Sequence, residues 1–159
     1  IAPSLVGSEM CLRDRPTWYL FHTLAEKVDD KYFNQLLPKL LHFITRICNN
    51  LPCPDCTNHA TNYLRGINYD KIETKEQLKH MLWTFHNVVN QRKGYMLFSY
   101  EDLNKKYSEA VTVNIIRNFF YHYSRKQYNI RLSMDNLTRR NILKELQQWL
   151  EQNSQKFFP

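Results

Sequence analysis

Apolar residues recur at helical spacing through most of the chain, and the longest such run lies between Phe33 and Ile47. Its members are Phe33, Leu36, Leu37, Leu40, Leu41, Ile44 and Ile47. This spacing places them on one face of an α-helix, which we expect to end at Asn49-Asn50. Pro38 lies within the stripe and has no backbone N–H, so we expect the helix either to start near Pro38 or to bend there.

Further stripes predict a helix before this one and helices near the end of the chain. Asp14 and Pro16 suit the cap and the first turn of a helix that ends near Val28. Residues 100–129 carry apolar positions typical of a short helix running into a longer one. A last amphipathic segment starts at about Asp135, and its apolar face carries Ile142, Leu143, Leu146, Trp149 and Leu150.

One more helix is defined at both of its ends. Thr74 and Gln77 have the spacing of a capping box, and the apolar stripe after them continues to Gly94. The whole chain contains only three glycines. Tight turns and bulges between strands need glycine, so this scarcity and the helical spacing together predict an all-α protein.

Composition limits the size and the partners of the protein. A chain of 159 residues with 43% hydrophobic residues can bury one compact core. Lys and Arg number 22 against 15 Asp and Glu, but these basic residues are scattered, so we expect no nucleic-acid groove. No apolar run approaches the about 20 residues of a membrane span. Residues 1–10 precede the first predicted helix and are expected to be a leader.

The chain has four cysteines, and two of them form a Cys-x-x-Cys motif at Cys53 and Cys56. Pro52 ends the preceding helix and a new helix is expected from Cys53 to about Arg65, so the pair opens a helix. Backbone N–H groups at a helix start favour negative charge and therefore stabilise a thiolate. Redox exchange is the natural interpretation of such a pair.

Three other interpretations of the pair compete with redox exchange, and the residues weigh against them to different degrees. A zinc site needs four ligands, and only Cys48, His42 and His59 lie nearby, at no common ligand spacing. A thioredoxin-like protein needs strands alternating with helices around the motif, which this pattern does not offer. Free cysteine is also a common core residue, so both could be structural.

Two predicted helices carry candidate pocket residues. Trp18 and His22 share a face of the first helix, and His86, Val89 and Asn90 share a face of the helix that follows Thr74. Facing helices of this kind could enclose a cofactor. Aromatic rings and imidazoles on an apolar stripe are also ordinary core residues, so this pattern alone does not distinguish a pocket from a core.

Taken together, these motifs resemble the Erv/ALR sulfhydryl oxidases, especially those of large cytoplasmic DNA viruses. The matching blocks are WYLFHTLA at 18–25, LPCPDC at 51–56 followed by His59-Ala60, FHNVVN at 85–90, and more loosely FSYEDL at 98–103 with Tyr107. They occur in the family's order and at similar separations. The resemblance covers residues 11–110, which we expect to form the oxidase domain, and 111–159 would be a C-terminal helical extension.

The resemblance implies a four-helix bundle with a short fifth helix that binds FAD and forms a homodimer. It assigns the adenine and ribose ends of FAD to Trp18, His22, His86 and Asn90, further cofactor contacts to Arg15, Val89 and Tyr107, and redox catalysis to Cys53 and Cys56. In the implied mechanism a substrate thiolate attacks Cys53. The released Cys56 thiolate then passes electrons to the flavin, and O2 is reduced to H2O2. No metal is implied.

The resemblance also implies partners and a location. Protein thiols or a thioredoxin-like shuttle protein would be the electron donors, and the site of action would be the host cytoplasm, at a virus factory, or the virion. The chain departs from cellular relatives at Tyr100, where they have a structural cysteine, and at Tyr107, where tryptophan is common. Only Cys11 or Cys48 could act as a further relay, and residues 111–159 could cover the bundle, extend a dimer interface or hold a partner.

Overall fold

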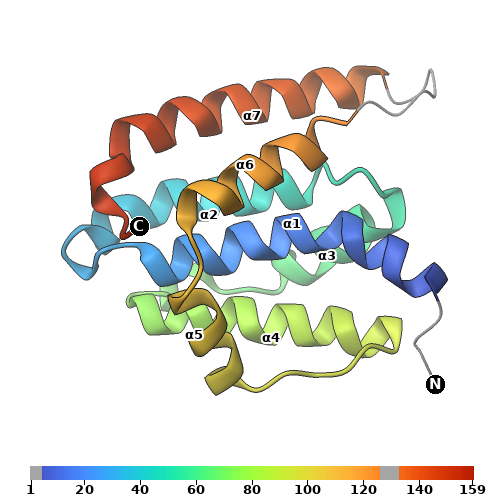
Figure 1. The fold of residues 1–159 in the computed structure, drawn as a ribbon, viewed down its shortest axis with the longest axis horizontal. Coiled ribbons are helices and arrows are strands. Elements are labelled where there is room, and N and C mark those ends of the chain that lie inside the picture. The colour runs from blue at the N-terminus through green and yellow to red at the C-terminus, as the bar shows by residue number, and fades with distance from the viewer. Residues whose placement is uncertain (1–4, 126–132) are drawn as a thin grey trace.

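A computed structural model describes residues 5–125 and 133–159, with side chains described for 15–125 and 136–159. Within these ranges the structure is all-α, as predicted (Figure 1). The α-helices are α1 Leu5–Lys27, α2 Phe33–Cys48, α3 Pro54–Arg65, α4 Lys75–Lys93, α5 Tyr100–Ser108, α6 Thr112–Tyr123 and α7 Ser133–Asn153. Short 3-10 turns lie at η1 Asp30–Tyr32, η2 Tyr69–Lys71 and η4 Ser154–Lys156.

The predicted capping signals of α4 are present in the structure. The hydroxyl of Thr74 accepts a hydrogen bond from the backbone N–H of Gln77 at 3.2 Å, and the Gln77 side chain accepts one from the N–H of Thr74 at 3.0 Å. At the other end Gly94 adopts φ 74°, a left-handed conformation that other residues rarely adopt. Both boundaries of α4 therefore follow from local chemistry.

The first two helices differ from their prediction in extent. α1 begins at Leu5, upstream of Asp14, so Pro16 lies inside the helix rather than in its first turn. The helix also runs through part of the 1–10 segment that was expected to be a leader; Glu, Met, Leu and Arg favour helix there. α2 starts at Phe33, a little before Pro38, and continues through it.

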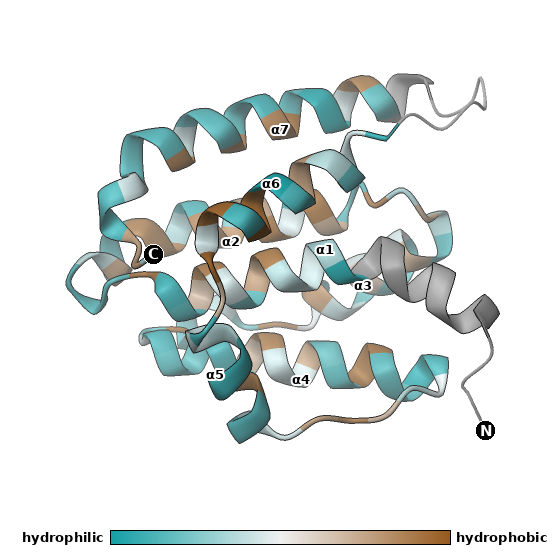
Figure 2. Cartoon of the chain, in the orientation of Figure 1, coloured by the Kyte–Doolittle hydropathy of each residue, from teal (hydrophilic) through white to brown (hydrophobic). Residues whose placement is uncertain are grey.

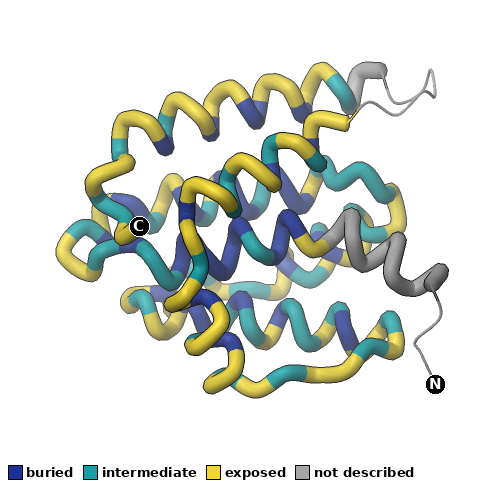
Figure 3. The backbone as a smooth tube through the Cα atoms, in the orientation of Figure 1, coloured by how far each residue is buried: buried dark blue, intermediate teal, exposed yellow. Residues whose placement is uncertain are grey.

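The C-terminal helices belong to the same hydrophobic core as the bundle. α6 packs along α1 and α7 packs against α2, while α4 and α5 cover the other side of α1 (Figure 1). Apolar and buried positions of α6 and α7 face these neighbours and polar positions face outward (Figures 2 and 3). Phe119, Ile142 and Leu146 are fully buried. Each such side chain contributes about 1.5–3 kcal/mol by leaving water, so this burial holds α6 and α7 against the bundle.

The end of the chain ties α1 to α6. Phe157 forms an antiparallel bridge with Val28, and the N–H of Asp29 donates to the carbonyl of Lys156 at 2.9 Å. The hydroxyl of Thr112 donates to the carbonyl of Phe158 at 2.9 Å. These backbone contacts fix the position of α6 relative to the end of α1.

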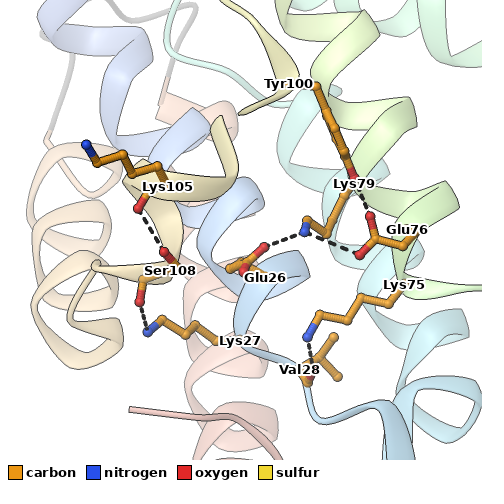
Figure 4. Close-up of polar contacts among 9 residues, drawn as sticks. All are labelled: Glu26, Lys27, Val28, Lys75, Glu76, Lys79, Tyr100, Lys105 and Ser108. Atoms are coloured by element: carbon orange, nitrogen blue, oxygen red, sulfur yellow. Dashed lines mark hydrogen bonds and ion pairs between the residues drawn. The ribbon is translucent and has the colours of Figure 1, made fainter. Parts of the chain in front are cut away.

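A polar network fastens α5 to α4 and α1 (Figure 4). The Tyr100 hydroxyl donates to the Glu76 carboxylate at 2.6 Å, and Lys79 lies 2.7 Å from Glu26 and 3.4 Å from Glu76. The hydrogen bond from Tyr100 lowers the pKa of Glu76 below its usual value. Tyr100 is the position where the family resemblance places a structural cysteine in cellular relatives, and here its hydroxyl links α5 to α4.

Candidate redox site

The Cys-x-x-Cys pair lies at the start of α3, as its sequence predicts. Cys53 is the N-cap residue with extended backbone, and Pro54 occupies the first helical position, where a missing N–H leaves no bond unmade. The sulfur of Cys53 accepts a hydrogen bond from the N–H of Cys56 at 3.3 Å, and the two sulfurs are 2.6 Å apart. Both side chains are half-buried, so they can meet each other and an incoming thiol.

Cys56 faces a small cavity between α1, α3 and α4. Its wall is formed by Thr17, Trp18, Phe21, Cys48, Leu51, Cys56, His59, Ala60, Phe85, Val89, Arg92 and Lys93. The ammonium of Lys93, in the last turn of α4, lies 3.9 Å from the Cys56 sulfur. The motif's second cysteine therefore connects the protein surface with an apolar interior that contains Trp18 and Val89.

Aromatic rings from α1 and α4 continue inward from this cavity. The ring of Trp18 stacks on that of His86, with centroids 4.1 Å apart and planes 6° apart. The Nε2 of His22 lies 2.9 Å from the Nδ1 of His86, so one imidazole donates its N–H and the other accepts it. Tyr107 of α5 lies against His22 at 4.9 Å between ring centroids. Three helices thus converge on one ring cluster.

Burial keeps the two imidazoles of this cluster neutral. Desolvation, followed by the positive charges of Lys106 and Lys93, lowers the pKa of His86 to about 3. Desolvation also lowers the pKa of His22 well below its usual value, with His86 and Lys106 adding to the effect. The Nδ1 of His22 is buried and has no hydrogen-bond partner among the described residues. Such an atom is costly unless a polar ligand satisfies it.

The structure brings most of the predicted site residues together. Those in the ring cluster or on the cavity wall are Trp18, His22, Cys56, His86, Val89 and Tyr107. Asn90 is buried one turn after His86 on α4. Arg15 is exposed one turn before Trp18, and its contact with a cofactor stays a prediction.

Two features near the cluster escaped the sequence analysis. The ring of Phe98, in the connection between α4 and α5, lies 4.8 Å from that of His86. Asn87 holds this connection by accepting from the N–H of Phe98 at 3.2 Å and donating to its carbonyl at 3.0 Å. Both residues stand in the blocks that carry the resemblance, but helical spacing alone gave them no role.

The residues fit a flavin nucleotide in chemistry. Stacked aromatic faces suit planar rings, the free His22 nitrogen offers a hydrogen bond, and Val89 gives an apolar wall beside the Cys56 sulfur. The open volume beside Cys56 is about 40 Å³. Cofactor pockets usually start at about 300 Å³, so neighbouring side chains must separate to admit the ring system.

Other parts of the described chain offer no competing redox or metal chemistry. A larger cavity of about 690 Å³ lies between α6, α7 and the C-terminal residues, but no cysteine or histidine lines it. Within the described residues no group of three or more His, Cys, Asp or Glu is placed to hold a metal ion. None of the described helices combines the length and apolar character needed to cross a membrane.

A helical bundle that presents a dithiol at a helix start, beside a buried cluster of aromatic rings, defines a helical thiol redox protein. The chain belongs to the Erv1/Alr family, whose sequence model matches residues 15–108. This match covers more than half of the chain and confirms the family resemblance. It ends at the last residue of α5, so α6 and α7 lie beyond it.

Curated relatives come from a plant and from DNA viruses. The chain is 27% identical over 95 residues to "FAD-linked sulfhydryl oxidase ERV1" of Arabidopsis thaliana, across 60% of this chain and 49% of the plant protein. It is 27% identical over 96 residues to the "FAD-linked sulfhydryl oxidase" of African swine fever virus (isolate Pig/Kenya/KEN-50/1950), across 60% of this chain and 75% of the viral protein.

A third relative is "Putative FAD-linked sulfhydryl oxidase 096R" of Invertebrate iridescent virus 3. It is 30% identical over 76 residues, which are 47% of this chain and 51% of that protein. The match thus spans about half the length of the plant and iridescent virus relatives. No solved structure matches the chain at a significant level.

Proposed function

We propose that this protein is an FAD-dependent thiol oxidase that forms disulfide bonds in protein substrates through Cys53 and Cys56. The observation that carries the proposal is the position of Cys56. Its sulfur lies 2.6 Å from that of Cys53 and borders the cavity that Trp18 and Val89 line. The names of the relatives support the same activity.

The thiol step starts from the pair in its disulfide form. A substrate thiolate attacks the Cys53 sulfur, the Cys53–Cys56 bond breaks, and its electron pair stays on Cys56 as a thiolate. A second substrate thiolate then attacks the substrate sulfur bound to Cys53, which releases the substrate disulfide and the Cys53 thiolate. The substrate loses two electrons and the pair gains them.

The ring cluster supplies the cofactor site in this proposal. Trp18, His22, His86 and Asn90 would hold the adenine and ribose end, with Arg15, Val89 and Tyr107 contributing further contacts. The bound FAD would take two electrons from the reduced pair and pass them to O2, which gives H2O2. The neutral imidazoles of His22 and His86 suit this role because they can donate and accept hydrogen bonds without adding charge.

The proposal extends to partners and location. Protein thiols, directly or through a thioredoxin-like shuttle protein, would donate electrons, and the viral relatives support action in the host cytoplasm, where unaided disulfides are rare. Occurrence at a virus factory or in the virion stays part of the proposal. A homodimer is also proposed, and the second copy would dock on faces that α6 and α7 leave uncovered.

Flavin content and oxygen consumption of the purified protein test the proposal. We expect a yellow protein that releases FAD on denaturation and consumes O2 when a dithiol is added, with one H2O2 formed per disulfide. A colourless protein that contains zinc would support a zinc-binding module instead. A yellow protein without oxygen uptake would indicate an inactive member that keeps only the fold. Sedimentation of the same sample tests the homodimer.

A further inference from the structure

We infer that Lys93 is a positioning residue that makes Cys56, rather than Cys53, the leaving sulfur in thiol exchange. This inference rests on the proposed oxidase function and adds a residue that the family resemblance does not assign. Its basis is the distance of 3.9 Å between the Lys93 ammonium and the Cys56 sulfur. The contact joins the last turn of α4 to the first turn of α3.

The two sulfurs have different surroundings. The Cys53 sulfur, at the N-cap position, accepts the backbone N–H of Cys56 at 3.3 Å, which is a dipole without net charge. The Cys56 sulfur faces a full positive charge on Lys93 and borders the cavity. A cation within about 4–6 Å favours the charged form of a neighbouring acid, and Lys93 is half-buried, where water screens the charge less than at a free surface.

This asymmetry selects which sulfur is attacked. In thiol–disulfide exchange the sulfur that better bears negative charge leaves faster, so the incoming thiolate bonds to the other one. An attack on Cys53 sends the electron pair to Cys56, beside the ammonium of Lys93. An attack on Cys56 would instead send the electron pair to Cys53, whose sulfur accepts the backbone N–H of Cys56. Lys93 therefore directs the substrate to Cys53 and leaves the thiolate on Cys56, which faces the cavity.

Other charged or titratable groups around Cys56 must be separated from Lys93. They come from α2, α3 and α4 and are Cys48, Cys53, Asp55, His59 and Arg92. Arg92 precedes Lys93 on α4, carries the same charge and lines the same cavity, but it is exposed. Replacing Arg92 therefore removes an equal charge from the same turn. It tests whether the effect needs the contact between Lys93 and Cys56 or only positive charge in this turn of α4.

The test measures the alkylation rate of each cysteine in the anaerobically reduced protein across pH 5 to 9, about the range in which thiols titrate. Iodoacetamide pulses followed by mass spectrometry report each position. In Lys93→Met we expect Cys56 to react about tenfold more slowly near neutral pH and Cys53 to change by less than about twofold. Lys93→Arg should restore the parent rate, and Arg92→Gln should change it by less than about threefold. Equal effects of Lys93→Met and Arg92→Gln, or none in Lys93→Met, would overturn the inference.

A second readout follows the direction of attack. Oxidised protein mixed briefly with glutathione and quenched in acid should carry the mixed disulfide at Cys53. In Lys93→Met a substantial share should move to Cys56, and an unchanged distribution counts against the role of Lys93. Circular dichroism checks the fold of each variant. Parent protein that shows these thiol properties without oxygen uptake would refute the oxidase proposal and leave the role of Lys93 intact.

Discussion

The end of α2 and the start of α3 carry the same chemical group in opposite environments. Cys48 closes α2 with 2% of its surface exposed, and burial raises the pKa of its thiol far above the usual value. Cys53 and Cys56 follow after a short turn, half-buried, with a helix start and Lys93 beside them. The environment of a cysteine, and not its presence in a cluster, therefore decides whether it can react.

The surroundings of the two ends explain the contrast. α6 and α7 pack over the α2 end, and the Tyr123 hydroxyl donates to the carbonyl of Asn50 at 3.0 Å. Nothing comparable covers the start of α3 within the described chain, where Pro54 and Asp55 are exposed. The C-terminal helices therefore seal one thiol in the core and steady the turn that presents the other two.

The largest expected effect is loss of turnover when either half of the pair is replaced. Cys53→Ser and Cys56→Ser should each lower dithiol-dependent oxygen uptake by about a thousandfold or more, because serine cannot form the disulfide that exchange requires. Bound FAD should remain at the parent ratio, as measured by absorbance. A variant that keeps parental turnover would show that the reactive thiols lie elsewhere.

The second effect is a pH dependence of stability caused by the buried imidazoles of His22 and His86. In the unfolded chain His22 and His86 bind protons below pH about 6.5, whereas in the fold they stay neutral because burial lowers both pKa values. The unfolded state thus binds more protons, and the free energy of unfolding should fall by about 2–4 kcal/mol between pH 7 and 5.

Urea unfolding at both pH values measures that change. His86→Gln should reduce the pH dependence, since it removes one of the two imidazoles. His59→Gln replaces an exposed imidazole on α3 and serves as the control for the loss of a histidine outside the ring cluster. If the free energy of unfolding changed equally with pH in His86→Gln and in the parent, the buried imidazole of His86 would not be a source of the pH dependence.

A smaller effect is expected at the hydrogen bond that links α6 to the turn between α2 and α3. Tyr123→Phe removes only the hydroxyl that donates to the half-buried carbonyl of Asn50, at a cost of about 0.5–1.5 kcal/mol in the free energy of unfolding. Chemical denaturation gives this value. Tyr121→Phe, at an exposed ring of the same helix, should change stability by less than about 0.5 kcal/mol. A loss in the control as large as in Tyr123→Phe would remove the role of this bond.

The smallest effect on activity is expected at the sealed thiol. Cys48→Ala should leave oxygen uptake within about twofold of the parent, because a thiol that stays protonated neither attacks nor leaves. It should lower stability by about 1 kcal/mol through lost packing. A Cys48→Ala variant that is as inactive as Cys53→Ser would show that Cys48 takes part in electron transfer. Burial would then not separate Cys48 from the reactive pair.

Several helix boundaries and helix faces could be predicted from the sequence, because residues close in sequence determine them. The capping box at Thr74 and Gln77, the left-handed Gly94 and the N-cap role of Cys53 all depend on residues close in sequence. The same is true of the faces that carry Trp18 and His86, because helical spacing defines them. Family resemblance then connected these faces with a flavin.

Features that depend on distant packing could not be predicted from the pattern. The sequence left three roles open for residues 111–159, and only the core that α6 and α7 share with α1 and α2 shows that these two helices pack on the bundle. Two elements distant in sequence bring Lys93 to Cys56, and no spacing rule links them. The early start of α1 was missed because Asp14 and Pro16 together imitate a helix start.

An anaerobic titration with a dithiol measures electron transfer from the cysteine pair to bound FAD. Adding a dithiol without oxygen should bleach the flavin absorbance of the parent protein and of Cys48→Ala. The flavin absorbance of Cys56→Ser should persist. Cys56 is the cysteine of the pair that lines the cavity, and this variant has no sulfur at that position. Bleaching of the flavin in Cys56→Ser at the parent rate would show that electrons reach FAD without Cys56.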